Sequence, residues 1–283
     1  MGLSPCAVSS LVGNARPPGL CPAVVQLLRS RLVAAIRSTV ISVSDRPTLD
    51  RLLAGAPPAT IEDVVERLQA IEHGLPAGDG VAWFARLYLE VTRSVGTALI
   101  PGTFRDPAFL LQLDLAFAGL FFDALRRSLR EPPATPKAWG PLIEARATRG
   151  IAPIQFALAG MNAHINRDLP IALVTTCEQA GVDLMEAEPE RADFERVNDL
   201  LAATEQRVKT QFATGLIGVV DVAFGDVDDR IAMWNVGRAR DAAWVQALTL
   251  WALRVIPPLQ RDAIDTLDHV VGFAGRGLLV PVS

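Results

Sequence analysis

A polar cluster inside an apolar run is the feature that most constrains how this chain folds. The run extends from Ile151 to Val174, and apolar neighbours on both sides of the cluster predict that it is buried. A histidine, two carboxamides and a carboxylate fall within seven residues of it: Asn162, His164, Asn166 and Asp168. Buried polar side chains destabilise a fold unless they are hydrogen-bonded, so these four need partners.

Helical geometry divides the cluster into two pairs. His164 and Asp168 are four residues apart and share one face, while Asn162 and Asn166 form a second ridge about 160° away. Pro170 lacks a backbone donor and disfavours helical angles in the residue before it. We therefore expect the helix to kink or end near Asp168 and to free backbone carbonyls there. Such an end is a candidate ligand or metal site. The alternative is a core helix in which histidine and aspartate only pair with each other.

Apolar residues recur at helical spacing along most of the chain, and proline or glycine separates the repeats. This pattern predicts an all-α fold of about nine helices, with no sheet larger than two short strands. The stretch 215–222 is open to either helix or strand. The clearest helices are expected at Val81–Leu99, Pro107–Leu129, Ala152–Asp168, Asp193–Phe212, Asp229–Val255 and Leu259–Phe273.

Helix ends are also visible in the sequence. Thr60 followed by Asp63 three residues later is typical of a capped helix start, and Asp79 can cap the next helix. Gly74 is expected to end the first of these helices in the left-handed conformation, and Gly181 to close the run that comes after Pro170.

The first part of the chain differs from the rest. Residues 1–21 are rich in proline, glycine and serine, which predicts poor order, and one or two helices are expected before a linker at 55–58. We therefore divide the chain into an N-terminal extension, residues 1–56, and a main helical domain, residues 57–283, that carries the site.

Composition excludes several classes of function. With 27 basic and 31 acidic residues the net charge is −4, and the only lysines are Lys137 and Lys209, so we expect no binding to nucleic acid. Three cysteines without zinc-site spacing, and no convincing signal peptide, favour a cytoplasmic protein. No apolar run reaches the roughly 18 residues of a membrane span, the nearest being 151–163 and 216–224. Arginine-rich and alanine-rich usage suggests a bacterial source. The oligomeric state stays open.

Several residues elsewhere are candidates to join the cluster. Asp114 lies inside an apolar helix, Tyr88 is the only tyrosine, and Arg240 and Trp244 lie together on a late helix. We assign His164 as the catalytic acid or base, Asp168 as the residue that orients it, and Asn162 as a holder of a substrate oxygen. The expected substrate-binding residues are Asn166, Asp114, Tyr88, Arg240 and Trp244.

A metal site is the alternative use of the same residues. Side chains at positions i and i+4 of a helix can chelate one ion, and the motif with a proline shortly after it is similar to one in all-α zinc phospholipases and single-strand nucleases. Those trinuclear sites need many histidines, whereas this chain has three: His73, His164 and His269. A mononuclear site of His164, Asp168 and one more carboxylate stays open. The expected cofactor is thus none or one divalent metal ion.

Residues 160–169 read Gly-Met-Asn-Ala-His-Ile-Asn-Arg-Asp-Leu, and a set of spaced positions accompanies them. These positions are Asp79-Gly80-Val81, Phe84, Leu87, Tyr88, Thr92, Phe104, Asp106, Leu113-Asp114, Phe117, Phe121, Trp139, Arg240 and Trp244. In these residues the chain resembles an uncharacterised bacterial and fungal domain family with the signature Gly-Met-Asn-Ala-His-Ile-Asn-x-Asp-Leu, from about Thr60 to Leu253. The resemblance implies a helical fold and no particular chemistry.

Three functions are compatible with these features. The one we favour is an enzyme of secondary or lipid-like metabolism that uses the buried cluster for acid–base chemistry on a small, largely apolar substrate, since a histidine beside a carboxylate suits proton transfer near neutral pH. Cyclisation, isomerisation and hydrolysis all stay open. The alternatives are a metal-dependent hydrolase and a non-enzymatic helical binding protein.

Overall fold

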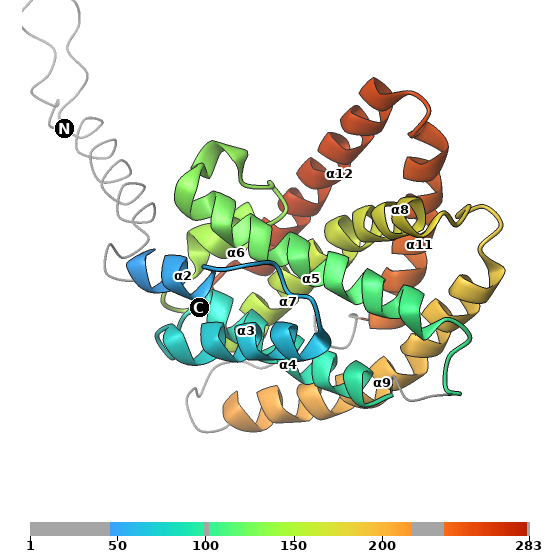
Figure 1. Ribbon diagram of the computed structural model, residues 1–283. Helices are drawn as coiled ribbons and strands as arrows, with labels where there is room; N and C mark the ends of the chain where they lie inside the picture. Colours follow the sequence, from blue (N-terminus) through green and yellow to red (C-terminus); the bar gives the residue numbers. More distant parts are fainter. Residues whose placement is uncertain (1–45, 99–101, 217–234, 282–283) are drawn as a thin grey trace, which may run out of the picture. The chain divides into compact units, whose positions relative to one another are not determined.

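The computed structural model describes residues 46–98, 102–216 and 235–281, and these ranges contain helices and no strand, which confirms the predicted all-α fold (Figure 1). If α7, η2 and α8 are counted as the single rod that they form, the described ranges hold nine α-helical rods, as expected. The elements are α2 (Arg46–Leu52), α3 (Ile61–Gly74), α4 (Gly80–Ala98), α5 (Pro107–Arg130), the 3₁₀ turn η1 (Pro132–Ala134), α6 (Gly140–Ala145), α7 (Pro153–Ala163), the π-helical segment η2 (His164–Asp168), α8 (Leu169–Ala180), α9 (Glu188–Leu216), α11 (Val236–Leu253) and α12 (Pro257–Leu278).

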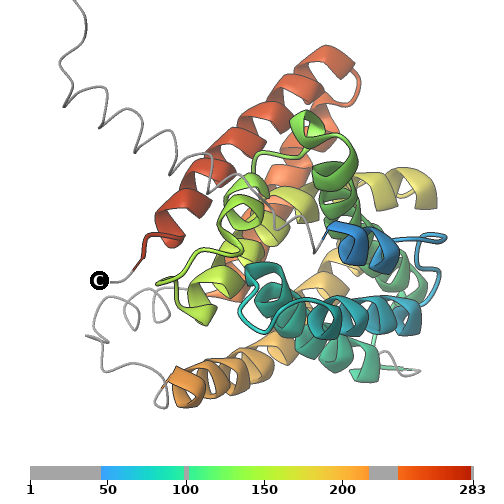
Figure 2. The ribbon, with the colours of Figure 1, turned by 90° about the vertical axis from the view of Figure 1, so that its left-hand side faces the viewer.

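The rod formed by α7, η2 and α8 is the one on which the other helices are assembled. Its α7 part packs against α4 and α12, its α8 part packs against α5 and α11, and η2 between them contacts α5, α11 and α12 (Figures 1 and 2). Large side chains with almost no exposure fill the space around it, among them Trp139, Phe84, Phe121 and Phe156. His164 and Asp168 of the polar cluster therefore lie at the centre of the core, whereas Asn162 and Asn166 are only partly buried.

The structure confirms most of the predicted helix ends. The hydroxyl of Thr60 accepts a hydrogen bond from the backbone N–H of Asp63 at 3.1 Å, and the Asp63 carboxylate accepts one from the N–H of Thr60 at 3.0 Å. Asp79 caps α4 by accepting from the N–H of Val81 at 2.8 Å. Gly181 closes α8 with a φ of 67°, in the left-handed region. Each of these ends depends on neighbours in sequence, which is why it could be predicted.

The prediction for Gly74 was wrong. Gly74 is the last residue of α3 and does not have a positive φ, and Leu75, in an extended conformation, caps the helix. The glycine has a packing role instead, because a Cβ at Gly74 would lie 2.7 Å from Cδ1 of Leu52. The absence of a side chain lets α2 approach α3 closely.

The interruption predicted near Asp168 takes a different form from the expected helix end. The rod continues through η2, where the N–H of Leu169 donates to the carbonyl of His164, five residues earlier. This widened turn places Pro170 in the first turn of α8. A proline is tolerated there because a backbone N–H at this position would not be needed for an intrahelical hydrogen bond. The proline is accommodated without a break, and no open helix end forms beside His164.

The predicted boundary at residue 56 stays a prediction. Residues 1–45, which include the expected disordered start and the helix expected from residue 22, lie outside the described residues, as does most of the stretch 215–222. Within the described part, α2 packs against α3 and α5, and Leu49 and Leu53 are buried in the same core as the rest.

One described helix is apolar enough to cross a membrane by length and composition. It is α5, with a mean hydropathy of 1.7 over 18 residues, and half of that window is buried within the fold. The sequence did not predict such a stretch, because its apolar residues are interrupted by Asp114 and Asp123. Phe109, Leu113 and Phe121 of α5 are buried against other helices, so we interpret α5 as a core helix.

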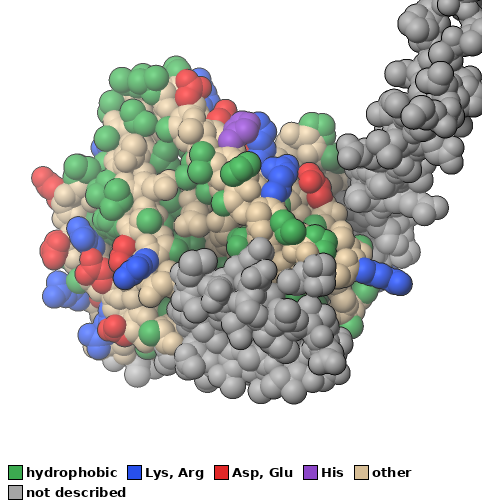
Figure 3. Space-filling model, turned by 180° about the vertical axis from the view of Figure 1, so that it is seen from behind, with side chains coloured by type: hydrophobic (Ala, Val, Ile, Leu, Met, Phe, Trp, Pro, Cys, Tyr) green, Lys and Arg blue, Asp and Glu red, His purple; other side chains and the backbone are tan. Residues whose placement is uncertain are grey.

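Hydrophobic side chains also gather on the surface formed by α12 and the end of α11 (Figure 3). The largest exposed fractions there belong to Phe273, at 80%, and Val255, at 74%, with Val270, Ile256 and Leu259 also exposed. None of these residues lies in the buried polar cluster, so this surface is a separate feature of the molecule.

Candidate functional site

The π-helical segment η2 fixes His164 in the middle of a group of aromatic rings. The imidazole is 1% exposed and stacks on Phe117 of α5, with ring centroids 3.5 Å apart and planes within 6°. Tyr88 and Phe84 of α4 meet it edge-on, at centroid distances of 4.6 Å and 5.8 Å. These contacts from two helices leave the ring one orientation.

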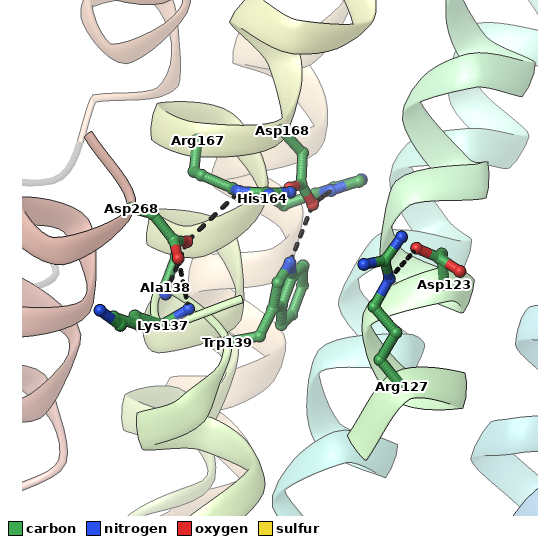
Figure 4. Close-up of polar contacts among 9 residues, drawn as sticks. All are labelled: Asp123, Arg127, Lys137, Ala138, Trp139, His164, Arg167, Asp168 and Asp268. Atoms are coloured by element: carbon green, nitrogen blue, oxygen red, sulfur yellow. Dashed lines mark hydrogen bonds and ion pairs between the residues drawn. The ribbon is translucent and has the colours of Figure 1, made fainter. Parts of the chain in front are cut away.

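Asp168 holds one nitrogen of that ring (Figure 4). Its Oδ2 lies 3.1 Å from Nδ1 of His164 and accepts a hydrogen bond from Nε1 of Trp139 at 2.9 Å. Its Oδ1 accepts a charge-assisted bond from Arg167 at 2.7 Å. Because a carboxylate oxygen accepts hydrogen bonds, we assign the proton to Nδ1 of His164, which donates it to Oδ2.

The other ring nitrogen of His164, Nε2, differs from Nδ1 in its contacts. With the proton on Nδ1, Nε2 of His164 is a bare acceptor, and it is buried without a hydrogen-bond partner among the residues that the structure describes. Burial lowers the pKa of His164, and the contact with Asp168 only partly opposes that effect. The imidazole is therefore neutral near pH 7, with its free lone pair at Nε2.

A second layer of contacts supports Asp168 (Figure 4). Nε of Arg167 lies 3.3 Å from Oδ1 of Asp268, a residue of α12. The Asp268 carboxylate also accepts the backbone N–H groups of Lys137 at 2.6 Å and Ala138 at 3.0 Å. Since Ala138 precedes Trp139, Asp268 contacts both Arg167 and the segment that carries Trp139, the two donors that reach Asp168 besides His164.

His164 lines a pocket of about 60 Å³, counted as the space open to the centres of water molecules. A single water needs roughly 10–15 Å³ on this measure, so the space holds about four to six waters or a small ligand of that size. Of the lining residues that the structure describes, eleven of sixteen are apolar, and they come from α3, α4, α5, α7, η2, α9 and α11. The polar ones are Tyr88, Thr92, Asp114, His164 and Arg240.

Asp114 lines this pocket one helical turn before Phe117, the residue on which His164 stacks. Its side chain is half-buried and makes no hydrogen bond or ion pair with any residue in the described ranges. Loss of solvent raises the pKa of the carboxyl to about 6, although Arg240 acts in the opposite direction. Asp114 therefore exchanges a proton near neutral pH.

Arg240 is a buried cation that lines the same pocket. It is 8% exposed, its Nε donates to Oδ1 of Asn198 at 2.7 Å, and a terminal nitrogen donates to the carbonyl of Phe194 at 2.9 Å. The guanidinium also lies 4.0 Å from the centre of the Phe194 ring. Burial lowers the pKa of Arg240 to about 10, so it stays charged at pH 7.

Of the other predicted substrate-binding residues, Tyr88 lines the pocket and Trp244 lies outside it. Tyr88 lines the pocket, and burial together with the nearby acids Asp114 and Asp168 raises the pKa of its hydroxyl well above the ordinary value, so the hydroxyl is neutral. Trp244 does not line the pocket and packs against Phe194, with ring centroids 5.0 Å apart. It supports the helix pair α9 and α11 that carries Arg240.

Asn162 and Asn166, predicted to hold substrate, lie on the other side of the rod. Nδ2 of Asn162 donates to the carbonyl of Val271 in α12 at 2.9 Å, and Nδ2 of Asn166 donates to Oδ1 of Asn162 at 3.1 Å. Neither lines the pocket. The angular separation of the two ridges explains this, and we correct their role to one of holding α12 on the rod.

The proposed chelation of one metal ion by His164 and Asp168 does not fit this geometry. Both carboxylate oxygens of Asp168 already accept hydrogen bonds, and Asp168 does not line the pocket that His164 faces. In the part of the chain that the structure describes, no three His, Cys, Asp or Glu side chains are grouped closely enough to hold an ion. The pair is arranged as a hydrogen-bonded dyad.

Four residues of the site were not assigned a role from the sequence. Phe117 and Trp139 were visible among the spaced positions of the family-like pattern, and Arg167 is adjacent to Asp168. Nothing local marks Asp268, because its partners are about 100 or more residues away in sequence.

Comparison with known families agrees with the resemblance to an uncharacterised family. A family model described as "Family of unknown function (DUF5995)" matches residues 61–281. The chain belongs to this family. The DUF5995 region begins at the first residue of α3 and extends past the end of α12, further than the resemblance noted from the sequence, and so contains every residue of the site. Comparison with curated proteins gave no match, and comparison with solved structures gave none either.

Proposed function

We propose that this protein is a small-molecule enzyme in which His164 acts as a general base through Nε2. The observation that supports this most directly is the state of that atom. It is buried, bears a lone pair, lacks a partner among the described residues and belongs to a residue that lines the pocket. Leaving a buried polar atom unpaired costs about 1–3 kcal/mol, a cost that a substrate donor would remove.

The surrounding residues suit each stage of a proton transfer. Nε2 takes a proton from a substrate hydroxyl or an acidic C–H, and the imidazolium that forms is stabilised by the carboxylate of Asp168. Trp139 and Arg167 hold Asp168 in place during this step through their hydrogen bonds to its two oxygens. Asp114, whose pKa is about 6, can carry a proton to or from the developing product on the other side of the substrate.

The character of the pocket narrows the substrate. Its mostly apolar walls and its size favour a small, largely apolar molecule with few polar groups. We retain the sequence-based expectations of a cytoplasmic protein that acts on such a molecule and not on nucleic acid. A binding protein without catalysis is the second candidate, because apolar walls with a few polar groups also suit a ligand carrier.

A comparison of wild type with a variant that lacks the imidazole of His164 distinguishes an enzyme from a binding protein. Wild type and His164→Gln are incubated with a bacterial metabolite extract, and mass spectrometry tracks which compounds disappear and which form. His73→Gln, a change at an exposed histidine of α3, serves as the matched control. We expect wild type and the control to convert at least one compound and His164→Gln to slow that conversion by 100-fold or more, roughly the share of a general base.

The tautomer provides an independent check. In ¹⁵N-resolved spectra of the imidazole groups, we expect His164 to carry its proton on Nδ1 and to stay neutral at pH 7. A protonated Nε2, or a conversion that proceeds equally fast in wild type and His164→Gln, contradicts the assignment of His164 as the base.

A further inference from the structure

We infer that the ligand of this pocket is a small amphipathic carboxylate, whose carboxylate group pairs with Arg240 and whose apolar body lies along the walls towards His164. The first observation is that Arg240 is a buried cation without an ion pair in the described part of the chain, although Asp114 and Asp241 are close enough to act on its charge. No carboxylate of the described residues lies within 4 Å of it, and its two hydrogen bonds go to neutral oxygens of Asn198 and Phe194. Buried charges in proteins are ordinarily paired.

The guanidinium has donors left for a ligand. It carries five N–H groups, of which the described contacts use two. Arg240 lines the pocket, so the unused donors belong to a group in contact with the cavity. A planar fork of donors matches the two oxygens of a carboxylate, and such bidentate pairs are stronger than neutral hydrogen bonds.

The charges of the polar groups in the pocket favour one kind of head group on the ligand over others. A cationic head would face the positive charge of Arg240, and a phosphate dianion would meet one cation only among the lining residues that the structure describes. Asp114 lines the same pocket and, when protonated, can donate a hydrogen bond to a second carboxylate. The raised pKa of Asp114 means that a proton is available for this shared bond below about pH 6.

The remaining space sets the size of the body. About four to six waters can occupy the pocket, which corresponds to a short chain or a single ring. Apolar residues such as Val91, Val95 and Leu201 line it alongside the polar groups. This inference rests on the proposed function in one respect, namely that the hydroxyl or C–H proton which His164 removes belongs to the body of this same ligand.

Binding can be measured without knowing the reaction. Isothermal titration of the wild-type protein compares hexanoate with two molecules of nearly the same shape, the neutral hexanamide and the cationic hexylamine, at pH 6 and pH 8. We expect hexanoate to bind at least tenfold more tightly than either, because only its head pairs with Arg240. Equal or tighter binding of the amide or the amine, or no binding of hexanoate at millimolar concentration, overturns the inference.

Two substitutions with opposite expected effects test the assigned partners. Arg240→Gln should weaken hexanoate about 10- to 100-fold and leave hexanamide nearly unchanged. Asp114→Asn should tighten hexanoate at pH 8 roughly tenfold, because it removes a like charge, and should abolish the weakening between pH 6 and pH 8. The groups that face Asp114 in the pocket are Arg240, which is charged over this range, Tyr88, which is neutral, and His164, whose neutral form is favoured by burial. If Arg240→Gln does not fold, the head-group series and Asp114→Asn still decide the matter.

His164→Gln distinguishes this inference from the proposed function. This variant should bind hexanoate within about threefold of wild type, since the head group contacts Arg240 and Asp114. Tight hexanoate binding by a protein that converts nothing in the extract supports the ligand class and contradicts the acid–base proposal. Conversion of neutral compounds only, without hexanoate binding, contradicts the ligand class and leaves the base in place.

Discussion

Asp114→Asn should stabilise this protein at neutral pH, although it changes a residue of the candidate site. The pKa of Asp114 is raised from 3.8 to about 6 by burial. The native state therefore binds more protons than the unfolded state between these two values, and stability is lost as the pH rises through about 6. At pH 8 the aspartate is charged in both states, and the native state bears the cost of holding that charge in the pocket.

The size of the effect can be worked out from the difference between the two pKa values. It is about two pH units, and each unit corresponds to about 1.4 kcal/mol, so the upper bound is about 3 kcal/mol. Asparagine has nearly the same shape and no charge, and it inherits no broken hydrogen bond, because Asp114 makes none with a described residue. Asp114 is only half-buried and solvent screens part of its charge, so we expect a gain of about 1–3 kcal/mol at pH 8.

Urea denaturation at pH 4, 6 and 8 measures this difference. The gain should be under about 1 kcal/mol at pH 4, where wild-type Asp114 is largely protonated when folded, and should rise to its full value by pH 8. Asp123→Asn is the matched control on the same helix. Asp123 is 38% exposed and pairs with Nε of Arg127 at 2.6 Å (Figure 4), so its removal should cost up to about 1 kcal/mol. A destabilised Asp114→Asn, or a gain that does not depend on pH, would refute the reasoning.

Three further substitutions test the packing of the site. Trp139→Phe removes the indole donor to Asp168 and should lower the free energy of unfolding by about 2–4 kcal/mol in urea denaturation, and a loss below about 1 kcal/mol would show that this donor is dispensable. Gly160→Ala would place a Cβ 2.3 Å from the ring of Phe84 and should cost at least about 2 kcal/mol, so an unchanged melting temperature would contradict the close contact of α7 with α4. Gly119→Ala, with nothing within 4 Å of the added Cβ, should instead stabilise α5 by up to about 1 kcal/mol in the same assay.

The parts of the fold that could be predicted are those specified by neighbouring residues. The capping box at Thr60 and the closing glycine at 181 depend on side chains within a few positions, and both are confirmed. Gly74 was interpreted wrongly because the same glycine that can end a helix can also allow a close approach, here by Leu52, which is distant in sequence. Local signals alone do not distinguish these two uses.

The site shows the same division between local and distant information. The hydrogen bond between His164 and Asp168 is expected from their spacing, and it is present at 3.1 Å. The role predicted for Asn162 was based on its nearness to His164 in sequence. The structure places Asn162 on a different face of the rod, the one that contacts α12. The pairing of Arg167 with Asp268 joins elements that only the assembled fold brings together.

The π-helical turn at residues 164–168 also has a consequence for the length of this segment. Each residue of an α-helix advances the chain by about 100° around the axis, so one extra residue in a regular helix would rotate everything after it by about a quarter of a turn. The π-helical turn holds one residue more than an α-helical turn and absorbs that rotation, which keeps α8 in the phase that buries Leu173 and Cys177 completely. Deleting one residue within the turn should therefore restore a regular helix with little rotation of α8, whereas deleting one from the regular part of α7 would rotate α8 and carry both side chains out of the core.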